Sequence, residues 1–240
     1  MTMERPPLTL RELAASSEVQ ALLTAADRAL AALGYTEHGP RHAALVAAGA
    51  QNLLLRLGYP PRLAELAAIA GYLHDVGNLI NRRDHGHSGA LLTFELLRRF
   101  GLPLDEIAEV MIAIGNHEDD SVPLSIPGAA VILADKSDVH RSRVRNQDPR
   151  TFDIHDRVNY AVTRALVDAD PASRTITIDL VIDTTMVSIL DFFEIFLGRM
   201  VQCRAAAAFL QCTLRLAING VVMDAHPPET PLEPLLPQFE

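Results

Sequence analysis

The chain has 240 residues, of which 49% are hydrophobic and 21% charged, a composition that excludes general disorder and favours a folded globular protein. The 30 acidic and 21 basic residues give a formal net charge of −9, so the molecule would repel a long nucleic acid, and we expect no such partner. Apolar stretches such as 186–198 contain acidic residues and fall short of the roughly 20 residues of a bilayer span. No membrane partner is expected either.

The amino terminus and the cysteines both predict a cytoplasmic protein. Residues 1–10 include Glu4 and a Pro6-Pro7 pair, and they lack the apolar segment of a secretion signal. Cys203 and Cys212 lie nine positions apart in one expected helix, on opposite faces, which disfavours a disulfide between them. We therefore expect two reduced, buried thiols.

Helical spacing of leucine and alanine predicts an all-α core in the first 140 residues. Glycine and proline mark the boundaries of the expected helices. These helices should cover about 8–33, 40–57, 61–73, 88–100, 104–114 and 127–138, with a polar loop over 78–87.

The pattern changes after residue 146. β-Branched residues are frequent in 158–167 and 175–182, and the Asp- and Pro-containing segment between them predicts a hairpin. Helical spacing then returns over 185–219, with a richly apolar surface. The fold class expected is mainly α. We divide the chain into a helical core, 1–146, and a C-terminal part, 147–240, with a small β-hairpin and two further helices that pack on the core and form a candidate homodimer contact.

Histidines and aspartates recur at the ends of the expected core helices. Helix ends in a compact bundle can converge on one point, where facing side chains build metal sites. Imidazole nitrogens and carboxylate oxygens suit divalent ions such as Mn, Fe, Co, Ni, Zn or Mg, and six ligands exceed what one catalytic ion with open positions would use. We therefore expect a dinuclear centre. Its candidate ligands are His42, His74, Asp75, His87, His117 and Asp135.

Asp75 is the natural bridge between two such ions, because each of its oxygens can bind one metal. His42, His74 and Asp135 would then serve one ion, and His87 and His117 the other. Two divalent ions and two aspartates leave a surplus of positive charge, which a hydroxide and an anionic substrate such as a phosphate ester would neutralise. A single histidine is better explained as an ordinary core or surface residue, so the inference depends on the ordered set.

This ordered set resembles the HD-domain superfamily of metal-dependent phosphohydrolases, whose pattern is a histidine, a His-Asp doublet and a distant aspartate on an all-α core. The matching segments are His-Ala-Ala-Leu-Val at 42–46, Tyr-Leu-His-Asp-Val-Gly-Asn at 72–78 and Leu-Ala-Asp-Lys at 133–136, and the similarity spans about residues 38–140. Members with two metals add two histidines between the doublet and the final aspartate, which His87 and His117 resemble.

The resemblance implies an HD-type core that binds divalent metal ions and uses a metal-activated hydroxide. It gives His74 and Asp75 catalytic roles, and Lys136, next to Asp135, is the third candidate catalytic residue. Many relatives carry lysine three positions after the doublet aspartate, whereas this chain has Asn78.

The phosphate contact of that lysine could have moved to the dense basic run of Lys136, Arg141, Arg143 and Arg145, because arginine presents a planar fork to phosphate oxygens. A solvated helix end explains the same run equally well.

Further candidate substrate-binding residues are His38, Asn78, Arg82 and His85. His38 and His85 each lie close to a proposed ligand, so they could contact substrate, support a ligand, or exchange roles with it. Asn78 and Arg82 follow the doublet and could line the mouth of the pocket, although loop polarity alone also explains them. Residues 118–120 could orient His117 or simply form a polar loop.

The leading hypothesis is a phosphohydrolase that acts on a small, nucleotide-like phosphate ester or anhydride. One alternative is a di-iron oxygenase of the HD type, since a similar ligand set can hold two irons and activate dioxygen. Another is a non-catalytic nucleotide-binding regulatory protein, in which a ligand would raise the melting temperature without being consumed.

Overall fold

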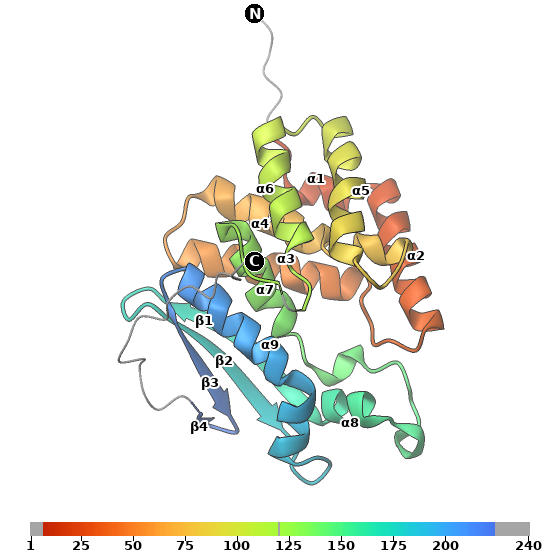
Figure 1. Ribbon diagram of the computed structural model, residues 1–240, viewed down its shortest axis with the longest axis vertical. Coiled ribbons are helices and arrows are strands. Elements are labelled where there is room, and N and C mark those ends of the chain that lie inside the picture. The colour runs from red at the N-terminus through yellow and green to blue at the C-terminus, as the bar shows by residue number, and fades with distance from the viewer. Residues whose placement is uncertain (1–6, 120, 224–240) are drawn as a thin grey trace, which may run out of the picture.

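The computed structural model describes residues 7–119 and 121–223. In Figure 1 the helices α1 to α7 form one body, and a small sheet with α9 across it lies below them. The predicted fold class is thereby confirmed: the described chain is mainly helical, with a small sheet near its C-terminal end.

The helical body follows the expected order along the chain. The helix predicted over 8–33 is two helices, because Ser16 takes an extended backbone conformation with ψ 124° and interrupts the helix directly before Ser17. The elements are α1 (Leu10–Ala14), α2 (Ser17–Ala32), α3 (Pro40–Arg56), α4 (Pro61–Leu73), the 3-10 turn η1 (Val76–Leu79), α5 (His85–Arg99), α6 (Leu104–Gly115) and α7 (Ile126–Lys136).

Helices α3, α4 and α7 pack against one another in the centre of the body. Their contact faces consist largely of alanine and other small apolar residues that are fully buried. A Cβ on Gly71 would lie 3.1 Å from the Cα of Ala47, closer than most real Cβ contacts, so glycine favours the close approach of α4 to α3. This approach brings His42, near the start of α3, to the end of α4.

The segment after α4 docks directly on α5. A Cβ on Gly77 would overlap the carbonyl oxygen of His85 and lie 2.5 Å from the backbone nitrogen of Gly89. The predicted loop over 78–87 therefore extends too far along the chain, because α5 begins at His85 and not at residue 88.

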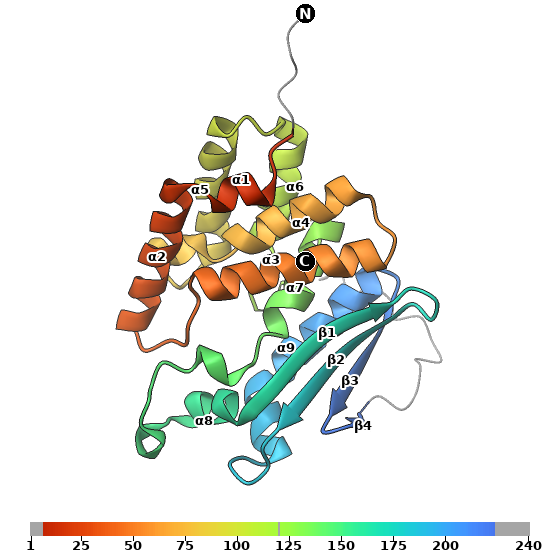
Figure 2. The same cartoon turned by 180° about the vertical axis from the view of Figure 1, so that it is seen from behind.

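The C-terminal part is an α/β unit. It comprises η2 (Arg141–Arg143), η3 (Pro149–Thr151), α8 (Ile154–Ala161), β1 (Val162–Asp170), β2 (Thr175–Ile182), α9 (Ile189–Phe209), β3 (Thr213–Ile218) and β4 (Val221–Val222). The strand order is β1-β2-β3-β4; β1 and β2 form an antiparallel hairpin, whereas β2 and β3 run parallel. Helix α9 connects β2 to β3 and covers one face of the sheet, as the two opposite views show (Figures 1 and 2).

Two expectations about this part are corrected. The first strand begins at Val162, because α8 occupies the preceding residues, so the two C-terminal helices are α8 and α9. The helix expected over 185–219 ends at Phe209: Gln211 has a left-handed backbone conformation with φ 57°, and the chain then enters β3. Cys203 and Cys212 therefore do not share a helix, although both are buried free thiols as expected.

The C-terminal unit contacts the helical body through α9, which packs on α7, and through β1, which lies against α3. The domain division at residue 146 and the homodimer contact remain predictions. None of the helices formed by residues 7–119 and 121–223 combines the length and the apolar character that a membrane crossing requires.

Candidate metal centre

Six buried ligand-type side chains converge where the helices of the body end. His42 lies in the first turn of α3, and the His74-Asp75 doublet directly follows α4. His117 lies just beyond α6, and Asp135 is in the last turn of α7. The remaining member is His85, the first residue of α5. The local folding of each helix end thus brings one or two ligands to a common point.

One group of ligand atoms gathers between α3, α4 and α7. The His42 Nε2 atom lies 3.3 Å from the Nε2 of His74 and 3.2 Å from Oδ1 of Asp135. The Nε2 of His74 lies 3.3 Å from Oδ2 of Asp75. Two imidazole nitrogens and two carboxylate oxygens therefore face one small volume.

A second group gathers on the other side of Asp75. The His85 Nε2 atom lies 3.1 Å from Oδ1 of Asp75 and 3.0 Å from the Nε2 of His117. The two groups adjoin, because the rings of His74 and His117 meet edge to face with centroids 4.9 Å apart. The two oxygens of Asp75 are thus divided between two sets of imidazole nitrogens.

His85, and not His87, supplies the ligand from α5. His85 is only 4% exposed, whereas His87 is exposed to solvent. Side chains two positions apart on a helix point about 200° apart around its axis, so only one of the two can face the centre. The structure therefore does not bring the predicted ligand His87 to the centre and places His85 there instead, in line with the role exchange considered for these two histidines.

The second nitrogen of each imidazole is occupied by an acceptor. Nδ1 of His74 lies 2.8 Å from the carbonyl oxygen of Gly71, and Nδ1 of His117 lies 2.6 Å from that of Ile114. In the same way Nδ1 of His85 faces the carbonyl oxygen of Arg82 at 3.1 Å, and Nδ1 of His42 faces the Asp138 carboxylate at 2.7 Å. Because Nδ1 donates in each ring, Nε2 is the nitrogen left to bind a metal ion.

The donor set fits divalent metal ions. Oδ2 of Asp75 is buried and has no hydrogen-bond partner among the described residues. The Nε2 atoms of His85 and His117 lie 3.0 Å apart, a distance at which two unprotonated nitrogens repel each other. Cations on both sides of Asp75 would satisfy the unpaired oxygen and remove this repulsion. Nitrogen and oxygen donors together are typical ligands of first-row divalent metals.

The carboxylates make the centre attractive to positive charge. Burial lowers the pKa of His74, but Asp75 and Asp135 outweigh it and raise the pKa to about 10. Burial likewise opposes ionisation of Asp75 and Asp135, yet His74 and Lys136 respectively hold the pKa of each carboxyl well below its usual range. Burial lowers the pKa of His117, so this ring stays neutral. A proton or a metal ion can supply the charge that the two carboxylates attract.

Two polar side chains hold Asp75 and His85 in place. Asn78 donates from Nδ2 to Oδ1 of Asp75 at 2.7 Å, so it anchors the central carboxylate. Glu118 lies 3.2 Å from Nδ1 of His85 and also accepts from the backbone N–H of Gly86, so it orients His85 rather than His117.

Asp138 was not identified from the sequence, although it is the partner of His42. Its only sequence signal is its position three residues after Asp135. Burial opposes its ionisation, but the hydrogen bond to His42 and the charge of Arg143 lower the pKa of Asp138.

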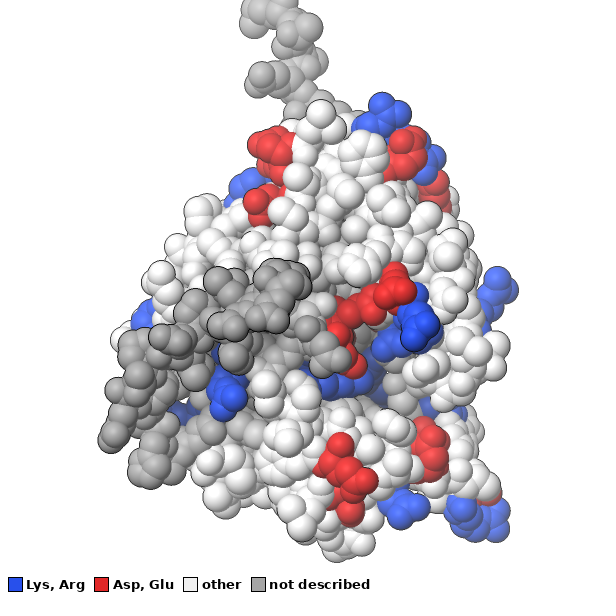
Figure 3. All heavy atoms as spheres, viewed as in Figure 1, with Lys and Arg blue, Asp and Glu red and all other residues white. Residues whose placement is uncertain are grey.

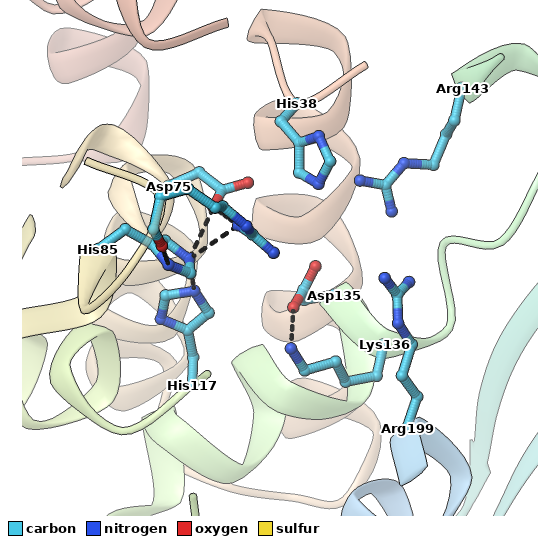
Figure 4. Close-up of a pocket in the computed structure, with 9 residues that line it drawn as sticks. His38, Asp75, His85, His117, Asp135, Lys136, Arg143 and Arg199 are labelled. Carbon is cyan, nitrogen blue, oxygen red and sulfur yellow. Dashed lines mark hydrogen bonds and ion pairs between the residues drawn. The ribbon is translucent and has the colours of Figure 1, made fainter. Parts of the chain in front are cut away.

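A pocket with several cationic side chains opens beside this centre (Figure 4). It is lined by His38, Asp75, Arg82, His85, His117, Asp135, Lys136, Arg143 and Arg199. Lys136 is buried and binds Oδ2 of Asp135 at 3.1 Å and Oδ1 of Asp119 at 3.0 Å. Arg143 is fully buried, and its NH2 group has no hydrogen-bond partner among the described residues. We call this hollow the cationic pocket.

The predicted basic run divides between pocket and scaffold. Lys136 and Arg143 line the cationic pocket, whereas Arg141 lies over the ring of Tyr160 at 5.0 Å. Arg145 donates to the carbonyl oxygen of Tyr35 at 3.1 Å and pairs with Asp27, so it is not a pocket residue. The predicted substrate-binding roles of Arg141 and Arg145 therefore do not agree with their positions.

Three further side chains complete the pocket. Arg82, which is predicted as a substrate ligand, lies 3.9 Å from Oδ1 of Asp75. His38 is buried, and burial together with Arg143 holds the pKa of its ring well below the usual value. Arg199 comes from α9 and has no counterpart in the sequence prediction; burial and Arg143 lower the pKa of its guanidinium.

Comparison with known proteins finds a family model that covers the segment from α3 to α7. Residues 41–139 match the model of the HD domain, in agreement with the resemblance of residues 38–140. An uncharacterized protein of Methanocaldococcus jannaschii, MJ1020, is 25% identical over 173 residues, covering 62% of this chain and 67% of its own. A crystal structure of a predicted HD superfamily hydrolase from an uncultured Thermotogales bacterium is 28% identical, covers 57% of this chain and 72% of its own, and has a TM-score of 0.43.

Proposed function

We propose that this protein is a metal-dependent phosphohydrolase that cleaves a small, nucleotide-like phosphate ester or anhydride. The observation that carries the proposal is the division of the two Asp75 oxygens between two sets of imidazole nitrogens, directly beside the cationic pocket. His42, His74, Asp75 and Asp135 would hold one divalent ion, and Asp75, His85 and His117 the other. Bound divalent ions polarise phosphoryl oxygens and lower the pKa of water.

The cations of the pocket would bind and orient the phosphate. Arg143 offers the unpaired NH2 group, and Arg82 and Arg199 line the same pocket. Arginine can donate two parallel hydrogen bonds to a phosphate, which fixes its orientation as well as its position. These side chains would hold the ester group against the metal ligands.

His38 and Lys136 have different parts in the proposal. Nδ1 of His38 is 2.7 Å from the carbonyl oxygen of Thr36 and donates to it, so its Nε2 is free to accept a proton or hydrogen bond from water or substrate. The lowered pKa keeps this ring neutral at physiological pH. Lys136 neutralises Asp135 and places positive charge beside the phosphate.

A small substrate agrees with the charge of the whole chain. The formal net charge of −9 disfavours a polymeric nucleic acid, whereas the cations of the pocket are concentrated at one point. In Figure 3 the basic side chains near the middle of this face are set back in a hollow, with acidic side chains beside them. An anionic group of limited size can enter such a hollow.

The test is phosphate release from a panel of nucleotides and sugar phosphates, with the full chain loaded with Mn²⁺ under anaerobic conditions. We expect turnover by the wild type, none by Asp75→Asn, and unchanged turnover by Arg145→Ala, because Arg145 does not line the pocket. Phosphate release without dioxygen also separates the hydrolase from a di-iron oxygenase. An active, metal-replete Asp75→Asn protein would contradict the proposal, as would a ligand that stabilises the wild type without being consumed by it.

A further inference from the structure

A second cavity of about 220 Å³ adjoins the cationic pocket. Its walls come from the segment after α6, from α8 and from α9. They are formed by Asp119, His155, Ile195, Gly198, Arg199 and Gln202. We call it the α8–α9 cavity. Arg199 lines both hollows, and Asp119 binds Lys136 of the cationic pocket at 3.0 Å. One molecule can therefore place an anionic end beside the metal ligands and its remainder in the α8–α9 cavity.

Gln202 lines the α8–α9 cavity and carries an unpaired hydrogen-bond acceptor. The side chain is 6% exposed, and its Nε2 donates to the carbonyl oxygens of Glu118 at 2.6 Å and Ser121 at 3.2 Å. These acceptors determine which end of the amide is nitrogen. Its Oε1 is buried and has no partner among the described residues. A buried acceptor without a partner needs a donor, which a bound water or a ligand group can supply.

The other walls favour a hydroxylated organic group. The Asp119 carboxylate is a further acceptor, and the apolar side chain of Ile195 can cover carbon atoms. The lining of the cationic pocket, by contrast, consists only of charged and histidine side chains. The volume is below the roughly 300 Å³ at which pockets for larger ligands begin, which suits a compact group such as a sugar.

We propose that the α8–α9 cavity binds the organic part of the substrate, a hydroxylated group of about the size of a sugar, and that the C-terminal unit thereby selects which phosphate compound is cleaved. This inference rests on the proposed function, because it assumes that the cationic pocket takes the phosphate. It adds a specificity role for Gly198 and Gln202, which lie outside the matched HD domain.

Gly198 allows the cavity to be blocked selectively. A Cβ at this position would meet no atom within 4 Å, so a larger side chain can enter without a clash. Replacing glycine within a helix also favours the helical backbone, so the variant should fold. Gly198→Phe places a ring in the cavity. Leu190→Phe is the matched control, because Leu190 is 79% exposed on the same helix and does not line the cavity.

The experiment is calorimetric binding to the Mn²⁺-loaded full chain. The two probes are methylphosphonate, which carries only the anionic group, and the phosphonate analogue of ribose 5-phosphate; their carbon–phosphorus bonds resist hydrolysis. We expect the wild type and Leu190→Phe to bind the sugar phosphonate about tenfold or more tightly than methylphosphonate. Gly198→Phe should lose this preference and keep its affinity for methylphosphonate.

The inference is overturned if the wild type binds both probes alike, if it binds neither, or if Gly198→Phe keeps the preference. Phosphate release from ribose 5-phosphate, measured on the same preparations, separates this outcome from failure of the proposed function. A binding preference that Gly198→Phe abolishes, without turnover by the wild type, would support the cavity and contradict hydrolysis of this compound. Turnover that Gly198→Phe leaves unchanged would contradict the cavity alone.

Discussion

Replacing His85 by alanine should weaken metal binding strongly, whereas replacing the nearby His87 by alanine should leave it unchanged. Nε2 of His85 lies 3.1 Å from Asp75 and 3.0 Å from His117, and in our proposal these three residues would be the protein ligands of the second ion. His85→Ala leaves that ion two protein ligands, fewer than the three that catalytic sites usually have. Loss of a supporting residue alone weakens metal binding by about 10- to 100-fold, so we expect loss of a ligand to cost on the order of 100-fold or more.

His87→Ala should change neither metal content nor turnover, because the side chain is exposed and surface substitutions usually alter stability by less than about 0.5 kcal/mol. The assay is metal analysis after dialysis against a weak chelator, combined with phosphate release. Wild type and His87→Ala should retain about two ions per chain, and His85→Ala about one. Loss of metal from His87→Ala, with full retention by His85→Ala, would refute the placement of α5.

Three further predictions follow from the same geometry. Asp138→Asn should weaken metal binding by about 10- to 100-fold, measured by competition with a chelating dye, because the carboxylate orients His42; unchanged affinity would exclude that role. Gly77→Ala should destabilise the protein by ~1–3 kcal/mol in urea unfolding, since its Cβ would overlap the His85 carbonyl oxygen; a wild-type midpoint would contradict this packing. Metal binding near pH 8 should release protons and strengthen as pH rises, because a metal ion must displace the proton held by His74, whose pKa is raised to about 10. Calorimetry in buffers of different ionisation enthalpy measures the number of protons released, and a value of zero would contradict this prediction.

Local sequence signals predicted the helical core well. Glycine and proline boundaries located α3, α4 and α6 to within a few residues, because these signals act on the backbone itself. The strand β3 was missed although its apolar residues alternate, because it directly follows a long apolar helix. The left-handed turn at Gln211, a conformation unusual for a residue other than glycine, separates the two elements and has no strong sequence signal.

The parts of the site that depend on tertiary packing could not be predicted in the same way. The ligand order from His42 to Asp135 was readable because each ligand lies at a helix end. The choice between His85 and His87 depends on the residue at which α5 begins, and Gly77 sets this start through its contact with the first turn. Arg199 enters the pocket only because α9 packs on α7, a contact between segments distant in the sequence.

The most direct test of the proposed dinuclear site is a crystal structure of the protein soaked in Mn²⁺, with anomalous scattering used to locate the ions. We expect two anomalous peaks, one on each side of the Asp75 carboxylate, the first beside His42, His74 and Asp135 and the second beside His85 and His117. A map with no peak among these side chains, or with manganese bound only elsewhere on the chain, would contradict the account.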